Sequence, residues 1–265
     1  MIQQNDGIAL YNCGKITMED NILHWNCGFG IRMNFADSCY VRRNDCSHVN
    51  RLTDPSDCAA ILLIASKYDT IEHNNFTYSG DGVFLSQQNY TQIPACNYFA
   101  YNDCSYSPHN AIECTFSAVN TFKENICNYS HYGFWLGYSS RTTVDHNEII
   151  GNLQTGIAVN KGYQNTFIGN TIKENPLGVE LWEGDRIAPY EDQDSRDYLI
   201  TSNLFEGNTM GISSKVTEHL VVKDNSFIRN KEDIYLEDKP VQDTLTGNTF
   251  KSPSLYHIRS PSTET

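Results

Sequence analysis

Apolar and polar residues alternate along this chain in short runs, and similar runs recur from one end to the other. A period of two indicates β-strands, because successive side chains of a strand point to opposite faces. The commonest run has the form Gly-Ile-x-Leu, in which x varies. It occurs, with apolar replacements, at Gly7–Leu10, Gly30–Met33, Gly82–Leu85, Gly133–Leu136, Gly156–Val159 and Gly178–Leu181.

A second phrase, Asn-x-(apolar or Cys), marks the register of the repeats. Most neighbouring copies are about 22 residues apart, a period typical of solenoids. Longer steps follow Asn44, Asn74 and Asn170. The ten anchor residues are Asn21, Asn44, Asn74, Asn102, Asn125, Asn147, Asn170, Asn203, Asn225 and Asn248.

Three short strands and the turns between them fill one repeat, as in one coil of a parallel β-helix. We therefore predict an all-β fold, a right-handed parallel β-helix of about ten coils over residues 1–250, with a tail over residues 251–265. Asn suits the turns because it tolerates left-handed backbone and its amide can bond the Asn of the next coil, ~4.8 Å away. A second polar column follows five residues after the anchor, at Asn26, Ser79, Ser130, Asn152, Asn175, Asn208 and Asn230.

The cysteines and the net charge of −13 narrow the class of protein. Cys46, Cys104 and Cys127 occupy the inward anchor column, and Cys114 an inward Leu position, so we expect buried thiols rather than disulfides or a metal site. The acidic charge disfavours nucleic acid and membrane surfaces as partners. No apolar run approaches the ~20 residues of a membrane helix, and no signal peptide is visible. Because the repeat is already under way at Gly7, we expect the chain to be the C-terminal part of a longer protein. We also expect a monomer.

The Gly-Ile-x-Leu run also predicts which side chains face outward. Phe84, Glu113 and Trp135 occupy the first outward column on three successive coils. A carboxylate between two aromatic side chains suits a sugar, since sugar rings stack on aromatic faces and an apolar flank raises the pKa of a general acid. The first column reads Ala9, Arg32, Leu62, Phe84, Glu113, Trp135, Ala158, Glu180, Ser213 and Tyr235, and the second reads Tyr11, Asn34, Ile64, Ser86, Thr115, Gly137, Asn160 and Trp182.

Ionisable residues cluster just before the same strands. Asp81 lies one coil before Glu113, and His109 and His131 are expected one coil apart. We predict Glu113, Asp81, His109 and His131 as catalytic candidates, although the last three also suit a role as turn caps. The expected substrate-binding residues are Arg32, Phe84, Tyr132, Trp135, Tyr138, Asn160, Glu180 and Trp182.

Three insertions lengthen the turns beside the first strand, near residues 51–58, 87–95 and 183–195. Insertions on one face of a solenoid often wall a binding groove, although simple loop growth explains them equally well. The third insertion is acidic, and its carboxylates between Asp185 and Asp197 offer oxygen ligands to Ca²⁺. A solvated acidic loop is the simpler interpretation, so we expect no resident metal or cofactor.

By these phrases the chain resembles the right-handed parallel β-helix superfamily over about residues 6 to 250. It is most similar to bacterial β-helix repeat proteins that carry phrases like Gly80–Leu85, Asn110–Ser117 and Tyr132–Ser139. Better-known members include pectate lyases, polygalacturonases, mannuronan epimerases and the periplasmic copper-maturation protein of nitrous oxide reductase. The resemblance implies an exported protein that acts on a polysaccharide or oligosaccharide. Neither the Asp-Pro-His signature of the epimerases nor the paired Asp-Asp of the polygalacturonases occurs here, so no catalytic set is carried over.

Three functions remain open from the sequence. A glycoside hydrolase would use Glu113 as acid and Asp81 as base or nucleophile, and requires the two carboxylates to lie within about 10 Å of each other. A lyase or uronate epimerase would use His109, His131 or Tyr132 as base and needs a cation to neutralise the uronate. A carbohydrate-binding or surface module would keep the aromatic face without turnover.

Overall fold

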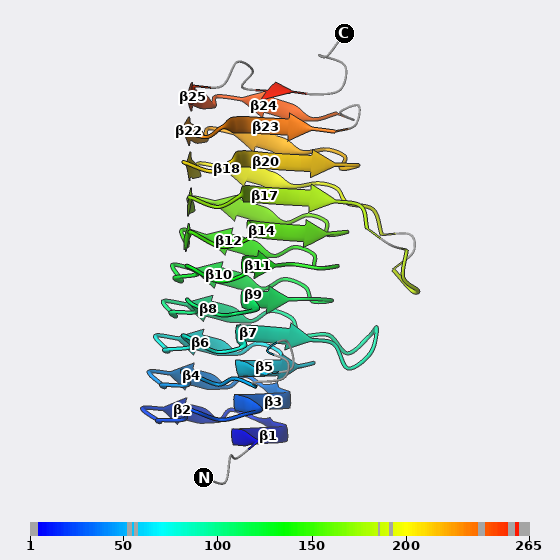
Figure 1. The fold of residues 1–265 in the computed structure, drawn as a ribbon. Coiled ribbons are helices and arrows are strands. Elements are labelled where there is room, and N and C mark those ends of the chain that lie inside the picture. The colour runs from blue at the N-terminus through cyan, green and yellow to red at the C-terminus, as the bar shows by residue number, and fades with distance from the viewer. Residues whose placement is uncertain are drawn as a thin grey trace.

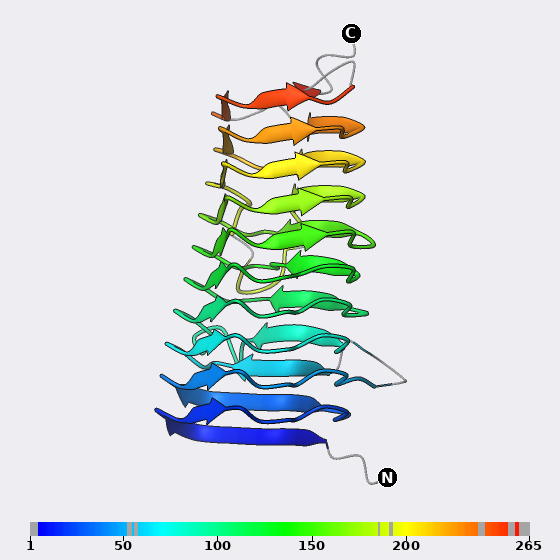
Figure 2. The ribbon, with the colours of Figure 1, turned by 90° about the vertical axis from the view of Figure 1, so that its left-hand side faces the viewer.

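The computed structural model describes residues 5–51, 55, 58–184, 186–190, 193–237, 242–253 and 258–259. Within this part of the chain every named strand pairs with its neighbours in parallel. Figures 1 and 2 show the coils stacked one on another from the N-terminal to the C-terminal end. The right-handed parallel β-helix predicted from the sequence is confirmed. None of the described residues forms a helix with the length and apolar character needed to cross a membrane.

Three parallel sheets make the faces of the solenoid. The first contains β1 (Asp6–Gly14), β3 (Phe29–Asp37), β5 (Ala59–Ile64), β7 (Asp81–Ser86), β9 (Asn110–Cys114), β11 (Tyr132–Trp135), β14 (Thr155–Asn160), β17 (Leu177–Trp182), β20 (Met210–Lys215), β23 (Glu232–Leu236) and β26 (Ile258–Arg259). The second contains β2 (Thr17–Glu19), β4 (Tyr40–Arg42), β6 (Thr70–Glu72), β8 (Tyr98–Ala100), β10 (Thr121–Lys123), β12 (Thr143–Asp145), β15 (Thr166–Ile168), β18 (Leu199–Thr201), β21 (Val221–Lys223) and β24 (Thr244–Thr246). The third contains β13 (Glu148–Ile150), β16 (Thr171–Lys173), β19 (Leu204–Glu206), β22 (Ser226–Ile228) and β25 (Thr249–Lys251).

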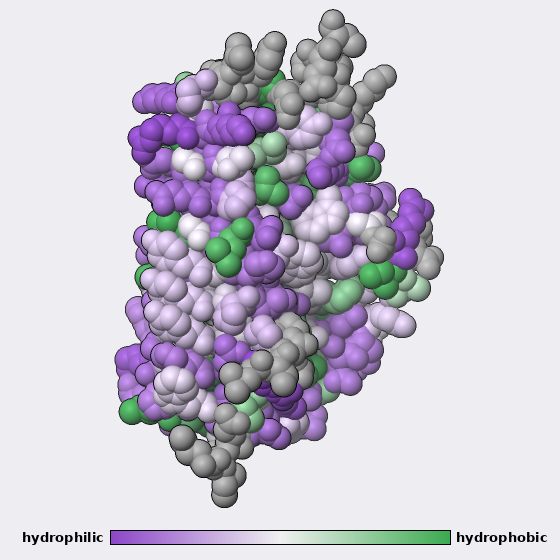
Figure 3. Space-filling model, viewed as in Figure 1, coloured by the Kyte–Doolittle hydropathy of each residue, from purple (hydrophilic) through white to green (hydrophobic). Residues whose placement is uncertain are grey.

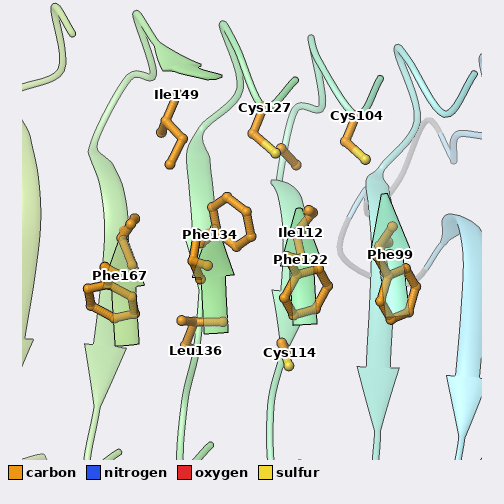
Figure 4. Close-up of a cluster of buried hydrophobic side chains, with 14 of the residues drawn as sticks. Phe99, Cys104, Ile112, Cys114, Phe122, Cys127, Phe134, Leu136, Ile149 and Phe167 are labelled. Atoms are coloured by element: carbon orange, nitrogen blue, oxygen red, sulfur yellow. The ribbon is translucent and has the colours of Figure 1, made fainter. Parts of the chain in front are cut away.

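The inward side chains of each coil form one continuous core. The Ile and Leu positions of the repeated run are buried, as Val83, Leu85 and Ile112 illustrate. Figure 4 shows how Phe side chains from successive coils stack, with the Phe99 and Phe122 rings 4.9 Å apart. The expectation that cysteines act as small apolar residues is confirmed at four positions that are buried free thiols: Cys46, Cys104, Cys114 and Cys127.

Asn side chains satisfy the buried backbone of the turns. The amide of each anchor Asn donates to the side-chain oxygen of the next, at 2.8–3.1 Å, through all nine steps from Asn21 to Asn248. The second ladder is also present, for example between Asn152 and Asn175 at 3.0 Å. These bonds pair groups that water cannot reach inside the stack.

A third ladder and an aromatic column were not predicted. In the third ladder Asp69 and Asn97 receive backbone N–H groups from the preceding coil. The aromatic column occupies a turn position with left-handed backbone, where the rings of Trp25, His48, Tyr78, Tyr106 and Tyr129 stack at 4.4–5.3 Å. Because these rings cover one another's faces, the column stabilises the stack rather than offering open platforms to a ligand.

Candidate functional site

Three ionisable side chains from two adjacent coils converge on the outer face of the first sheet. Asp81 is the first residue of β7, His109 precedes β9, and Glu113 lies within β9. Their ligand-type atoms all lie within 4.8 Å of one another. The distance condition for a carboxylate pair is therefore met.

Hydrogen bonds fix the relative positions of the three groups. His109 Nδ1 lies 2.8 Å from Asp81 Oδ1 and 3.8 Å from Glu113 Oε2. The backbone N–H of Asn110 donates to the same Asp81 oxygen at 2.8 Å, and the Asn110 amide donates to Glu113 Oε2 at 2.8 Å. The Thr115 hydroxyl donates to Glu113 Oε1 at 3.0 Å. The two donors of Asn110 thus hold both carboxylates in place, and the Thr115 hydroxyl holds Glu113 as well.

Burial differs sharply within the trio and assigns different roles to its members. The Asp81 side chain has no exposed surface, whereas those of Glu113 and His109 are 15% and 32% exposed. Asp81 was predicted as a catalytic candidate, but it lies beneath the imidazole of His109. A carboxylate in that position orients and charges the histidine and cannot itself contact a sugar. Glu113 and His109 are the two members that can do so.

The electrostatics of the trio favour proton transfer. Burial, and secondly the neighbouring Asp81 carboxylate, raise the pKa of Glu113 to about 7. Burial also raises the pKa of Asp81, against the opposing hydrogen bond from His109. Burial, with the nearby His109, lowers the pKa of His131. A carboxyl group poised near pH 7 can both donate and accept a proton, as general acid–base catalysis requires.

Two buried oxygen atoms of the site lack a hydrogen-bond partner among the described residues, Asp81 Oδ2 and Asn110 Oδ1. Buried acceptors without donors cost stability, and a folded protein keeps few of them. Such groups are concentrated at functional sites, where the destabilisation is tolerated because the groups serve chemistry.

The register places the aromatic flanks as predicted, because Phe84 pairs with Glu113 and Glu113 pairs with Trp135 on successive strands. On the Trp135 side the rings form a wall, in which Tyr132 and Trp135 lie 5.0 Å apart and Trp135 and Trp182 5.6 Å apart, edge to face. Tyr132, Trp135 and Trp182 are each partly exposed, so part of their ring surface is accessible to a ligand. His131 extends the wall at 4.8 Å from Tyr132.

Several candidate binding residues have other contacts. Phe84 packs with Ile64 against an outer apolar cluster that contains Leu62, so it is only partly available to a ligand. Arg32 forms an ion pair with Asp6 at 3.1 Å and lies three strands away from Glu113. The role of Arg32 in substrate binding therefore stays a prediction, and the residue is not adjacent to the strand that carries Glu113.

The prediction that Tyr138 is an outward sugar platform is wrong. Tyr138 is 6% exposed, and its ring stacks on Phe116 at 4.8 Å and lies 5.6 Å from Tyr190. Its backbone is left-handed, so the strand has already turned and the alternation no longer applies. Ala158 and Ser213 face outward in register but are buried too.

Two of the insertions meet beside the first sheet. The described residues of the third insertion, 183–184, 186–190 and 193–195, are here called the arm; they follow β17 and extend back along the coils, as the ribbon shows (Figure 1). The Tyr190 hydroxyl donates to Gln87 Oε1 of the second insertion at 2.7 Å. The space-filling view shows the projection that the loops make beyond the strand ends (Figure 3). The two insertions thus wall one flank of the first sheet, as the sequence suggested; the first insertion lies largely outside the described residues.

A buried lysine, which no sequence pattern marks, anchors the arm. Lys161 has no exposed side-chain surface and pairs with Glu183 at 2.6 Å. Its ammonium also donates to the backbone oxygen of Gln193 at 3.1 Å. Asn160, predicted to bind substrate, accepts the backbone N–H of Gly184 at 2.9 Å and so also holds the base of the arm.

Other residues of the site were missed for a related reason. Asn110 and Thr115 act through hydrogen bonds to Glu113, and no motif marks them. Alternation brings Thr115, two residues after Glu113, to the same side of the strand, whereas Asn110, three residues before it, has no such signal.

The proposed calcium loop lies partly outside the described residues, which omit Asp185, Glu191 and Asp192. Asp197 is described, and its carboxylate pairs with Arg196 and lies 3.0 Å from His219 Nδ1. Within the described part of the chain, the one group of three metal-binding side chains is the trio of Asp81, His109 and Glu113.

The fold and the trio define a parallel β-helix with an acid–base cluster on its first sheet. The chain belongs to the right-handed β-helix family, whose model, described as the right handed beta helix region, matches residues 2–100 and 59–188. A model described as the periplasmic copper-binding protein NosD matches residues 190–260, about a quarter of the chain. A comparison with curated protein sequences found no match.

The copper suggested by the NosD description finds no fitting set of ligands in the matched stretch. Its described residues include His219, which is already bonded to Asp197, and no group of three metal-binding side chains.

Three solved structures are described among those similar to the chain. The first is the A-module of the mannuronan C-5 epimerase AlgE6 of Azotobacter vinelandii, which is 13% identical, covers 93% of this chain and 58% of its own, and has a TM-score of 0.49. The second is the periplasmic alginate epimerase AlgG, which is 15% identical, covers 92% of this chain and 47% of its own, and has a TM-score of 0.50. The third is the catalytic domain of a GH87 α-1,3-glucanase with nigerose, which is 8% identical, covers 95% of this chain and 63% of its own, and has a TM-score of 0.52. At these identities the likeness shows the fold alone. The chain spans about half to two thirds of the length of these structures.

Proposed function

We propose that the chain is a polysaccharide-processing enzyme that hydrolyses a glycosidic bond on the outer face of β7, β9 and β11. The observation that carries the proposal is Glu113, a largely buried carboxyl group with a pKa near 7 beside the partly exposed Trp135 ring and a carboxylate-held histidine. The glucanase and the two epimerases show that the same fold supports glycan chemistry, which adds weight without deciding the reaction.

The roles follow from exposure and proton affinity. Protonated Glu113 donates its proton to the glycosidic oxygen as the C–O bond breaks. His109, oriented by Asp81, takes a proton from the water whose oxygen attacks the anomeric carbon. The two protons return to their starting positions through solvent. Tyr132 and Trp135 supply the platform on which the sugar ring stacks.

A second candidate is proton abstraction by His109, leading to elimination or epimerisation of a uronate. The Asp81–His109 hydrogen bond favours it, because a carboxylate makes an imidazole more basic. Against it, the first-sheet strands β7, β9, β11, β14 and β17 carry no lysine or arginine to neutralise a uronate.

Product analysis tests the proposal. Wild-type protein is incubated with neutral, amino-sugar and uronic polysaccharides, with and without EDTA, and new reducing ends and unsaturated products are measured separately. We expect reducing ends without unsaturated product, unaffected by EDTA. Unsaturated or epimerised product would instead establish the histidine-based reaction, and binding without any product would show a carbohydrate-binding module.

We also infer that the protein is exported, because the NosD model and AlgG are both described as periplasmic. Fractionation of cells that express the complete gene tests this inference. Recovery of the protein only from the cytoplasm would contradict it.

A further inference from the structure

The outer face of the first sheet has an unbalanced charge near its catalytic strands. On its strands β7, β9, β11, β14 and β17 the outward carboxylates are Glu113 and Glu180, and none of these five strands contains a lysine or arginine. The nearest cations are already paired: Lys161 is buried against Glu183 at 2.6 Å, and Lys215 lies 3.7 Å from Glu237. Glu180 has no ion-pair partner among the described residues.

Glu180 opens into a cavity of about 510 Å³ farther along the same face. The cavity is lined by Glu180, Trp182, Glu183, Lys215, Val216 and Glu237. It is continuous with the catalytic aromatic wall, because the Trp182 ring packs edge to face on Trp135 at 5.6 Å. The register separates Glu180 from Glu113 by three strand steps, or ~14 Å at the usual strand spacing.

A carboxylate beside an indole, as Glu180 and Trp182 are in this cavity, favours a cationic ligand. An ammonium group is attracted both to a carboxylate and to the face of a tryptophan ring, and the attraction is stronger where water is partly excluded. A sugar stacked on Trp182 that carries such a group would satisfy Glu180. A neutral sugar would leave the carboxylate without an ionic partner, and a uronate would meet like charge from Glu180 and Glu113.

We propose, resting on the function proposed above, that the substrate is a polymer of amino sugars in the protonated form. One sugar of the chain reacts at Glu113, and another unit of the same chain places its ammonium group between Glu180 and Trp182. Glu180 is thus a specificity-determining residue, and it takes no part in the proton transfer at Glu113.

A matched pair of oligosaccharides isolates the charge. Glucosamine hexamers and their fully N-acetylated counterparts have the same linkage and differ in the ammonium groups, and a uronate hexamer supplies the opposite sign. Affinity is measured by calorimetry and turnover by product release, for wild type, Glu180→Gln and Glu174→Gln. Glu174 is exposed on a turn away from this face and serves as the charge-matched control.

Glu180→Gln is expected to weaken binding of the glucosamine hexamer and raise its KM roughly three- to tenfold, with kcat unchanged. The acetylated hexamer should bind equally to both proteins, and added salt should weaken binding of the amino form to wild type only. Preference of wild type for the acetylated or uronate hexamer, or equal affinity of Glu180→Gln for the amino form, would overturn the inference.

The same data separate the two proposals. Binding of the amino hexamer that depends on Glu180, without turnover, would contradict hydrolysis and leave the substrate class standing. Turnover of another glycan with no dependence on Glu180 would contradict the substrate class and leave hydrolysis standing.

Discussion

Glu113 owes its properties to its neighbours within two coils. Its pKa, raised to about 7, depends first on burial and then on the Asp81 charge behind His109. As the acid of a hydrolase it must be protonated, so kcat/KM is expected to fall as the pH rises above about 7. The raised pKa also means that the folded state binds the proton more tightly than the unfolded state, so this group's contribution to the unfolding free energy declines as the pH rises from about 4.5 to 7.

The first prediction concerns this carboxyl group directly. A ¹³C NMR titration of Glu113 should give a midpoint near pH 7 in wild type and a lower one in Asp81→Asn, because the substitution removes the second cause of the shift. Asp81→Asn should also disturb the titration of His109, its hydrogen-bond partner. A midpoint near the ordinary value of 4.5 in wild type would contradict the account of the site.

Asp69 provides a second, independent test of buried charge. It occupies an Asn position of the third ladder, is 1% exposed, and keeps one oxygen without a partner. Burial raises its pKa to about 7. Its contribution to the unfolding free energy therefore falls as the pH rises from about 4 to 7.

Asp69→Asn should stabilise the protein, by roughly 1–3 kcal/mol above pH 7 and by little at pH 4, because the amide is neutral and can donate as Asn97 does. Urea denaturation at the two pH values measures the difference. Equal stability of the variant and wild type at pH 8 would contradict this prediction, because it would show that other interactions offset the cost of burying the Asp69 charge.

The sequence predicted the positions of individual side chains only where strand alternation holds. It predicted Phe84, Glu113 and Trp135 on neighbouring strands, and it brought Asp81 and His109 to the same edge. It misplaced Tyr138 because the backbone turns left-handed at that residue. It also could not show that Asp81 lies beneath the imidazole, since alternation does not predict how deeply the first residue of a strand is buried.

Among the structural elements, the anchor ladder is the one most directly encoded. Each Asn serves several partners at once: Asn147 accepts the backbone N–H of Asn125 at 2.8 Å and donates to the Phe122 carbonyl at 2.9 Å. The ten anchors were visible from their period alone. The third ladder was not, because Asp69 and Thr142 interrupt its Asn positions.

Asn147→Ala should lower the unfolding free energy by about 3–5 kcal/mol, because it leaves a buried N–H and a buried carbonyl without partners. The matched control is Asn21→Ala at the N-terminal end of the ladder, where the side chain is only partly buried and water can replace the lost bonds. Chemical denaturation of both variants checks the prediction. Equal losses at the two positions would contradict it.

The arm is an element that no repeat encodes. Its tip is held by Tyr190 through one hydrogen bond to Gln87 and ring contacts to Phe116 and Tyr138, and its base by Lys161. The sequence placed the insertion, but its path back along the coils depends on contacts between residues about a hundred positions apart.

Tyr190→Ala should raise the rate of tryptic cleavage after Arg186, within the arm, at least about tenfold, and Tyr190→Phe by less, because the ring contacts remain. Tyr11→Ala, an exposed tyrosine on β1, is the control. Unchanged cleavage in Tyr190→Ala would mean that the tip contacts do not hold the arm.

For the whole molecule, the architecture follows from the repetition of one coil. Each coil buries its apolar side chains against its neighbours, so the register of a single phrase specifies the sheets, the core and the outward columns together. The parts that determine function, namely the depth of the trio, the arm and the cavity beside Trp182, arise where the repeat is interrupted, and for that reason the sequence revealed them only in part.

The most direct measurement is the rate of glycosidic cleavage by Glu113→Gln beside wild type and Glu174→Gln, on the polysaccharide that wild type degrades fastest. Glutamine has nearly the size of glutamate and can still accept the hydrogen bond from Thr115, but it cannot deliver a proton. We predict a loss of at least about 10²-fold in kcat for Glu113→Gln, with the fold and glycan binding preserved and with Glu174→Gln at the wild-type rate. Wild-type cleavage by Glu113→Gln would contradict the assignment of the site.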